Sequence, residues 1–229
     1  MKTRSRFRRL TGGPAGSALT VVALLLVTPL LAPQLLAFPH RTQVGDSTVY
    51  AEQPIDRLAL GKVMARADRL VRKSSIARVE EPRQIFLTDG GWRWLWLANT
   101  TRGSFALTRP VRNSVIIVNG SDVSADRVSN GRRVGGRRTL SSVIAHEKTH
   151  GMLSHRYGRL AVIGKPQWLV EGYCDFVAQE SALSAQQAAA LQRADAGHPA
   201  LAYYLGRRRV AGILRANGGN VDALFEEID

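Results

Sequence analysis

The chain has 229 residues, of which 45% are hydrophobic and 22% are charged, and this is ordinary usage for a globular protein of about one domain. The composition excludes a disordered chain and a collagen-like repeat, and the single cysteine, Cys174, excludes an internal disulfide and a thiolate metal cluster. Lys and Arg number 32 against 18 Asp and Glu, so the net charge of +14 raises the question of a polyanionic partner.

The first 40 residues differ from the rest of the chain. Five cations lie within residues 1–9, and the uncharged, largely apolar stretch 18–38 follows them. A basic head before about 20 apolar residues predicts a membrane anchor whose basic end stays in the cytoplasm, with a cleaved signal peptide as the alternative. We therefore divide the chain into an anchor or signal segment, 1–40, and one domain, 41–229. That domain is expected outside the cytoplasm, either in a single-pass membrane protein or as a secreted or periplasmic protein.

Much of the remaining positive charge is arginine in two clusters, 132–138 and 207–209. The first lies in a glycine-rich stretch that is typical of a solvated loop. The second lies on an expected helix, where three consecutive side chains cannot share one face. Neither cluster is interleaved with aromatic residues as a nucleic-acid surface would be, so we expect no nucleic-acid partner. Anionic lipid headgroups or wall polymers stay open as partners.

The first half of the domain shows one helix and several short strands. Residues 55–73 carry apolar side chains at a spacing of 3.6 and predict an amphipathic helix. Short apolar runs bounded by turn residues predict strands at 84–88, 105–107 and 114–119. Residues 92–98, WRWLWLA, alternate in a way that favours a strand, although a helix or an aromatic loop is also compatible.

The pattern becomes helical after residue 139. Caps and apolar periodicity predict five helices, at 140–156, 166–180, 184–194, 199–216 and 221–228. A helix, then a small sheet, then several helices is the order of an α+β fold.

The expected helix 140–156 carries the motif H-E-x-x-H as His146, Glu147 and His150. Residues four apart on a helix project from one face, so both imidazoles can bind one Zn²⁺ ion at about 2.0–2.1 Å. Glu147 lies about 100° around the helix from His146 and can contact a water beside the metal without binding the metal itself. The motif predicts a zinc site with Glu147 as its general base.

A third ligand has to come from another part of the chain. The longer motif H-E-x-x-H-x-x-G-x-x-H is excluded, because Leu153 and Arg156 occupy its last two positions. A carboxylate from the next helix is the other solution, and Glu171 lies there among apolar residues. His₂Glu with an open fourth position is typical of catalytic zinc. Asp175, four residues further on, is expected to accept the second N–H of a ligand histidine and so to fix its tautomer.

The combination of H-E-x-x-H with W-L-x-E-G, here Trp168-Leu169-Val170-Glu171-Gly172, resembles the gluzincin clan of zinc peptidases, particularly its small bacterial families. The resemblance covers roughly residues 84–216. It implies a zincin-like domain with a small sheet and a mainly helical C-terminal half. It also implies Zn²⁺ held by His146, His150 and Glu171, and a strand at 114–119 along which an extended peptide could pair.

The reaction implied by the resemblance is hydrolysis of a peptide bond in a peptide or protein substrate, with Glu147 activating a zinc-bound water. Related enzymes use a Tyr or His from a later helix to stabilise the oxyanion, so Tyr203, Tyr204 and His198 are the candidates here. A non-enzymatic interaction protein on a peptidase-like scaffold at the membrane surface is the alternative. An intact Glu147 favours the enzyme, since a scaffold has no need of that carboxylate.

Overall fold

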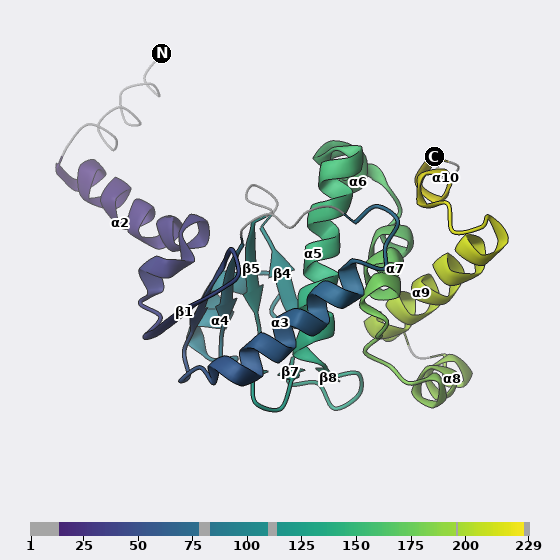
Figure 1. Ribbon diagram of the computed structural model, residues 1–229. Helices are drawn as coiled ribbons and strands as arrows, with labels where there is room; N and C mark the ends of the chain where they lie inside the picture. The colour runs from purple at the N-terminus through teal and green to yellow at the C-terminus, as the bar shows by residue number, and fades with distance from the viewer. Residues whose placement is uncertain (1–13, 78–82, 110–113, 196, 227–229) are drawn as a thin grey trace, which may run out of the picture. The chain divides into compact units, whose positions relative to one another are not determined.

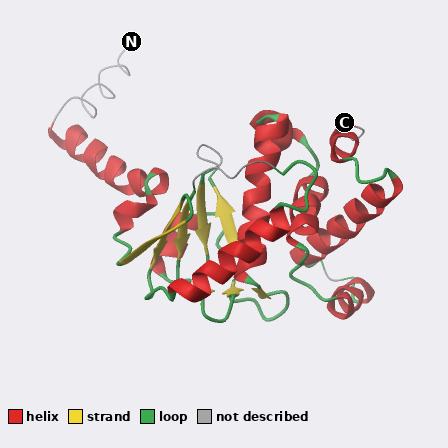
Figure 2. Ribbon diagram, in the orientation of Figure 1, coloured by secondary structure: helices red, strands yellow, loops and turns green. Residues whose placement is uncertain are grey.

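The structure is a computed structural model that describes residues 14–77, 83–109, 114–195 and 197–226. The chain divides into two units, Met1–Phe38 and Pro39–Asp229. The larger unit is a mixed α+β domain, with its strands in the first half and helices after them (Figure 2).

The described part of the smaller unit, residues 14–38, contains one α-helix and one short 3-10 helix. Helix α2 spans Pro14–Leu31 with Pro29 inside it, and η1 spans Pro33–Leu36. Among the residues that the structure describes, no helix combines the length and the apolar character needed to cross a membrane.

A five-stranded sheet forms the first half of the larger unit, in the order β1-β2-β3-β5-β4. The parallel core pairs β2 with β3 and β3 with β5, while β1 and β4 are antiparallel edge strands. The strands are β1 His40–Val44, β2 Ser47–Ala51, β3 Gln84–Leu87, β4 Ala106–Thr108 and β5 Val115–Val118. The three strands predicted at 84–88, 105–107 and 114–119 are therefore confirmed.

Helices cover both faces of this sheet. Because side chains alternate along a strand, Ile85 and Ile116 point to one face, where they share a core with α3, Arg57–Val71, and α5, Leu140–Tyr157. Phe86 points to the other face, on the side of α4, Trp92–Ala98. In Figure 1, α3 runs across the front of the sheet and α4 lies behind it.

A second, three-stranded sheet connects the large sheet to α5. It consists of β6 Ser121–Asp122, β7 Arg127–Ser129 and β8 Arg137–Arg138, all antiparallel. The sequence predicted a solvated loop over this arginine cluster, and that prediction is wrong at Arg138, whose side chain is buried.

Beyond β8 the described elements are helices. The five that were predicted are confirmed, and a short α6 separates the first two. They are α5, α6 Arg159–Gly164, α7 Gln167–Ala178, α8 Ala185–Arg193, α9 Pro199–Ala216 and α10 Val221–Glu226.

Two glycines allow α7 and α9 to cross at close range. A Cβ atom on Gly172 would lie 2.5 Å from the Gly206 carbonyl carbon, and one on Gly206 would lie 2.6 Å from the Trp168 carbonyl oxygen. Any larger residue would collide with backbone rather than with a movable side chain. Gly172, the glycine of W-L-x-E-G, is therefore required by helix packing. It sets the distance between the helix that carries Glu171 and the helix that carries Tyr203.

Two segments differ from expectation. Residues 92–98 form a helix, and the strand interpretation was wrong because a short apolar run matches both periods: Trp94, Leu97 and Ala98 share one buried helical face. The β1–β2 hairpin was not predicted, although Gly45-Asp46 is a typical two-residue hairpin turn and Gly45 has a positive φ of 54°.

Candidate metal centre

Helix α5 forms the base of the centre and is buried along most of its length. At its N-terminus the Thr139 hydroxyl accepts the Ser142 N–H at 3.4 Å and donates to Glu180 at 2.7 Å. The Glu180 carboxylate, just after α7, also accepts the Thr139 N–H and the Ser142 hydroxyl. These bonds attach the start of α5 to the end of α7, the two helices that carry the predicted ligands.

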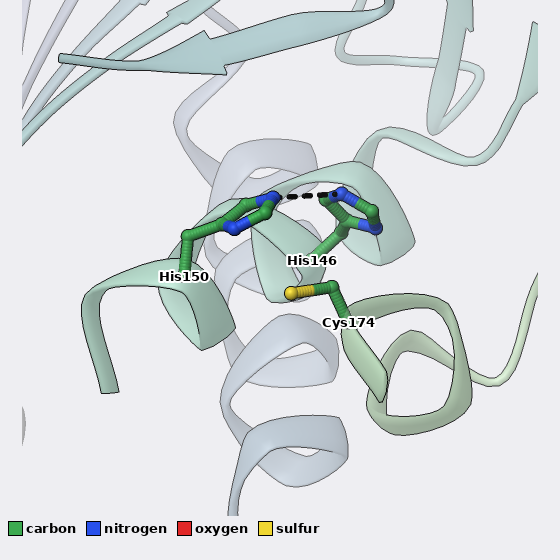
Figure 3. Close-up of side chains that lie close together, drawn as sticks. All are labelled: His146, His150 and Cys174. Atoms are coloured by element: carbon green, nitrogen blue, oxygen red, sulfur yellow. Dashed lines mark hydrogen bonds between the residues drawn. The ribbon is translucent and has the colours of Figure 1, made fainter. Parts of the chain in front are cut away.

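The three predicted ligands converge. His146 and His150 project from successive turns of α5, and their Nε2 atoms lie 3.2 Å apart (Figure 3). Glu171 reaches both from α7, with 3.2 Å to His146 Nε2 and 3.6 Å to His150 Nε2. Donor atoms around one tetrahedral ion with bonds of about 2.1 Å lie about 3.4 Å apart. The donor set and its spacing therefore suit a single ion of zinc's size.

Asp175 holds the far side of the His146 ring. Its Oδ1 lies 2.8 Å from His146 Nδ1 and accepts a second hydrogen bond of 2.8 Å from Arg138, while Ser181 donates to the other oxygen at 3.2 Å. In the neutral ring, with Nδ1–H donated to Asp175, the lone pair of His146 would lie on Nε2, facing His150 and Glu171. Arg138, reached from β8, keeps the buried Asp175 charge compensated, and this role was not predicted from the sequence.

The pKa values of His146, Glu171 and Asp175 are all shifted toward the charged forms of these side chains. Burial opposes the charge on His146, but hydrogen bonds to Asp175 and Glu171 outweigh it and raise the pKa of His146 to about 10. Burial also opposes the charge on Glu171, yet the two histidines hold the pKa of its carboxyl well below the usual range. The pKa of Asp175 is lowered against burial, chiefly by Arg138. Both carboxylates are ionised at neutral pH and favour a positive charge at the histidines, which is a proton on His146 in the metal-free chain and which a metal ion would replace.

Cys174 lies beside the same histidines. Donor atoms of His146, His150 and Cys174 all lie within 4.8 Å of one another, with the sulfur reaching them from α7 (Figure 3). The thiol is fully buried, and burial together with the nearby Glu171 carboxylate raises the pKa of Cys174 well above its usual range. The described residues therefore offer two third donors beside the histidines, the ionised Glu171 carboxylate and the Cys174 sulfur, and a metal would have to displace the thiol proton to bind Cys174.

Glu147 lies in the same cleft as the predicted ligands and is 6% exposed. The Thr108 hydroxyl donates to its Oε2 at 2.7 Å. Thr108 ends β4, the edge strand next to α5, so the sheet itself fixes the position of this carboxylate. No local pattern pointed to Thr108, because the contact joins residues 39 positions apart.

Of the predicted oxyanion donors, Tyr203 lines the cleft. Its hydroxyl accepts a 3.1 Å hydrogen bond from Gln167, and burial and the Glu171 carboxylate raise the pKa of Tyr203 to about 12, so it can donate at neutral pH. Tyr204 borders a different surface pocket, and His198 caps α9 by accepting the Ala200 N–H at 3.2 Å.

The strand along the cleft differs from the one that was expected. Residues 115–118 form β5, which is buried between β3 and β4 and has neither edge open. The cleft, of about 680 Å³, is lined instead by β4 and the residues before it, together with α5, α6, α7 and α9. The expectation for β5 is wrong because β4, which comes earlier in the chain, forms the edge of the sheet, and β5 then lies between β4 and β3.

Comparison with models of known protein families, with curated proteins and with solved structures finds no match for this chain. Interpretation of the site therefore depends on its residues and their geometry.

Proposed function

We propose that this protein is a gluzincin-type zinc metallopeptidase with a zincin-like domain, hydrolysing peptide bonds in a peptide or protein substrate. The observation that carries the proposal is the convergence of His146, His150 and Glu171 at zinc spacing, with the Glu147 carboxylate fixed beside them in an open cleft.

The residue types of the donor set suit Zn²⁺. Two imidazole nitrogens and one carboxylate leave a fourth position open, as in catalytic zinc sites. Zinc held there supplies a Lewis acid that polarises a carbonyl and lowers the pKa of water toward about 7. Asp175 and Arg138 keep His146 in the tautomer that presents Nε2 to the ion.

Glu147 is proposed as the proton carrier. Its Oε2 is occupied by the Thr108 hydroxyl, which leaves Oε1 to take a proton from the attacking water and return it to the leaving nitrogen. Tyr203, protonated at neutral pH, is the proposed donor to the developing oxyanion.

The edge of β4 is the proposed binding surface for the substrate backbone. Arg109 N–H bonds to Val115 and Asn119 N–H bonds to Phe105, so residues 105, 107 and 109 direct their backbone groups to β5. Ala106 and Thr108 then direct theirs away from the sheet, where an extended peptide could add as a further strand.

We propose an extracytoplasmic location for the domain. The basic residues before position 10 and the apolar stretch 18–38 support membrane attachment or export, with the bulk of the chain on the far side.

The test compares metal content with turnover in the purified 229-residue chain, using a peptide library to find a cleaved substrate. Glu147→Gln keeps all three donors and removes only the base, so it should retain near-stoichiometric zinc while losing about 10²–10⁴-fold in rate. His150→Ala should lose zinc and activity together.

Two outcomes would contradict the proposal. If Glu147→Gln loses zinc as fully as His150→Ala, Glu147 is a ligand or a structural residue. If zinc is bound but no library peptide is cleaved, the non-enzymatic interaction protein becomes the better description. A closed set of four ligands that includes the buried Cys174 would suit that description.

A further inference from the structure

A second surface pocket, of about 750 Å³, lies away from the metal centre. Three segments border it: the residues just after α3, the C-terminal end of α7 and the middle of α9. Figure 1 shows α3 ending beside α7, which α9 crosses. None of the described residues that line this pocket also lines the cleft of the metal centre. A role for this pocket therefore does not depend on the proposed hydrolysis.

Among the described residues that line this pocket, every charged side chain is basic. Lys73 follows α3, and Arg207 and Arg208 lie on α9. None of these three cations forms an ion pair with a carboxylate in the part of the chain that the structure describes. The Lys73 ammonium donates to the side-chain oxygen of Gln179, the residue that ends α7, at 3.5 Å. Tyr204 adds a hydroxyl to the lining, so the pocket combines positive charge with neutral donors.

Two of the three consecutive arginines on α9 can face this pocket together. Successive residues of an α-helix are about 100° apart, so Tyr204, Arg207 and Arg208 fall within an arc of about 100°. Arg209 lies about 100° further around the helix, and its guanidinium group lies over the Trp168 ring at 3.7 Å. The pocket therefore accounts for two arginines of the cluster 207–209, and the tryptophan accounts for the third.

The two helix ends at this pocket oppose the binding of an anion, but the cations outweigh them. The C-terminal end of a helix carries about −0.5 of an elementary charge, so α3 and α7 together contribute about −1. Backbone N–H groups of Lys73, Ser74 and Gln179 already bond to three of the terminal carbonyls. One cation would be enough to compensate both helix ends, and the pocket has three. The excess of about two positive charges is left for a ligand.

We propose that this pocket binds a phosphate group, carried by an anionic phospholipid headgroup or by a small phosphorylated molecule. Arginine binds phosphate oxygens through paired, charge-assisted hydrogen bonds, and lysine adds a further charged donor. A terminal phosphate offers three free acceptor oxygens, whereas a carboxylate offers two. Donors that approach from α9 and from the end of α3 therefore suit a phosphate better than a carboxylate.

The experiment uses the purified 229-residue chain in micelles of a neutral detergent. The thermal unfolding midpoint is measured against the concentration of inorganic phosphate at constant ionic strength, which gives a dissociation constant, and acetate is the carboxylate control. The variants are Lys73→Gln and Arg208→Gln, which change two different elements of the pocket. Arg215→Gln is the matched control, because Arg215 is exposed on the same helix as Arg208 and does not line the pocket.

Phosphate should raise the unfolding midpoint of the wild type more than acetate does. Lys73→Gln and Arg208→Gln should each raise the phosphate dissociation constant by about three- to fivefold, as expected for partly exposed ion pairs, while Arg215→Gln should leave it unchanged. Equal constants in the three variants, or equal effects of phosphate and acetate, would overturn the inference. A loss in Arg208→Gln without a loss in Lys73→Gln would also overturn it, because the anion would then bind the exposed face of α9 and not the pocket.

Two further probes distinguish the sources of the phosphate group. Glycerophosphoglycerol is the headgroup of phosphatidylglycerol without its acyl chains, and micelles that contain phosphatidylglycerol or phosphatidylcholine present headgroups at a surface. Stabilisation by phosphatidylglycerol over phosphatidylcholine, lost in Lys73→Gln and Arg208→Gln, would identify a lipid headgroup. Tighter binding of inorganic phosphate than of glycerophosphoglycerol, without an effect of either lipid, would identify a small phosphorylated molecule.

Discussion

At the scale of single residues, the site depends on a chain of contacts that runs from a candidate metal donor into the protein: His146 to Asp175 to Arg138. Asp175 is fully buried, and an unpaired carboxylate there would be costly. Arg138 offsets that charge, so Asp175 can hold His146 without being neutralised by protonation. The apolar residues around Asp175 indicated that its charge would need a compensating partner. They did not indicate that Arg138 would be that partner.

Removing Asp175 should weaken metal binding without abolishing it. Asp175→Ala frees the His146 ring and leaves Arg138 uncompensated, so the zinc dissociation constant should rise by about 10–100-fold. Ser181→Ala is the matched control, because it removes only the longer hydrogen bond to the other oxygen of Asp175. Competition with a chromophoric chelator measures both constants. Equal affinities in the two variants would show that Asp175 does not position the donor.

Thr108 should affect turnover but not zinc content. Thr108→Val is nearly isosteric and removes the hydroxyl that holds Glu147 Oε2, so kcat should fall by roughly tenfold while zinc content stays constant. Thr108→Ser restores a hydroxyl and should recover most of the rate. Wild-type turnover in Thr108→Val would mean that the sheet does not position the base.

At the scale of elements, the crossing of α7 and α9 brings Glu171 and Tyr203 to the cleft, and it depends on glycine. Gly206→Ala would place a methyl group against the Trp168 backbone and should lower the free energy of unfolding by about 1–3 kcal/mol. Gly212 lies on the same helix with nothing within 4 Å of its Cβ position, so Gly212→Ala should raise stability by up to about 1 kcal/mol. Urea unfolding followed by circular dichroism measures both. If both substitutions lower the free energy of unfolding, the cause would be alanine within helix α9 and not the close crossing of α7 and α9.

Long periodic elements were predictable, and contacts between distant segments were not. The helix that carries H-E-x-x-H and the one that carries Glu171 were recognised because each spans several turns with one apolar face. The run at 92–98 was misassigned because seven residues fit both a strand and a helix. The roles of Thr108 and Arg138 require a pairing across 39 and 37 positions, and no local pattern encodes that.

At the scale of the whole molecule, the net charge of +14 has two separable parts. The cations before position 10 precede an apolar stretch, and the proposed export of the domain would leave them on the cytoplasmic side. The arginines of the large unit serve several local purposes: Arg138 compensates a buried carboxylate, Arg132 lies at the cleft, and Arg209 lies over the Trp168 ring at 3.7 Å. A single polyanionic partner is not needed to explain them.

The location of the domain can be tested with a reporter. An enzyme that is active only in the cytoplasm, fused after Asp229, should be silent in cells that express the full 229-residue chain, because the basic head is expected to stay inside while the rest is exported. The same reporter fused to residues 39–229 alone should be active, since that chain lacks both the basic head and the apolar stretch. Immunoblotting of both fusions controls for expression. A full-length fusion as active as the truncated one would place the metal centre in the cytoplasm and would limit its substrates to cytoplasmic peptides.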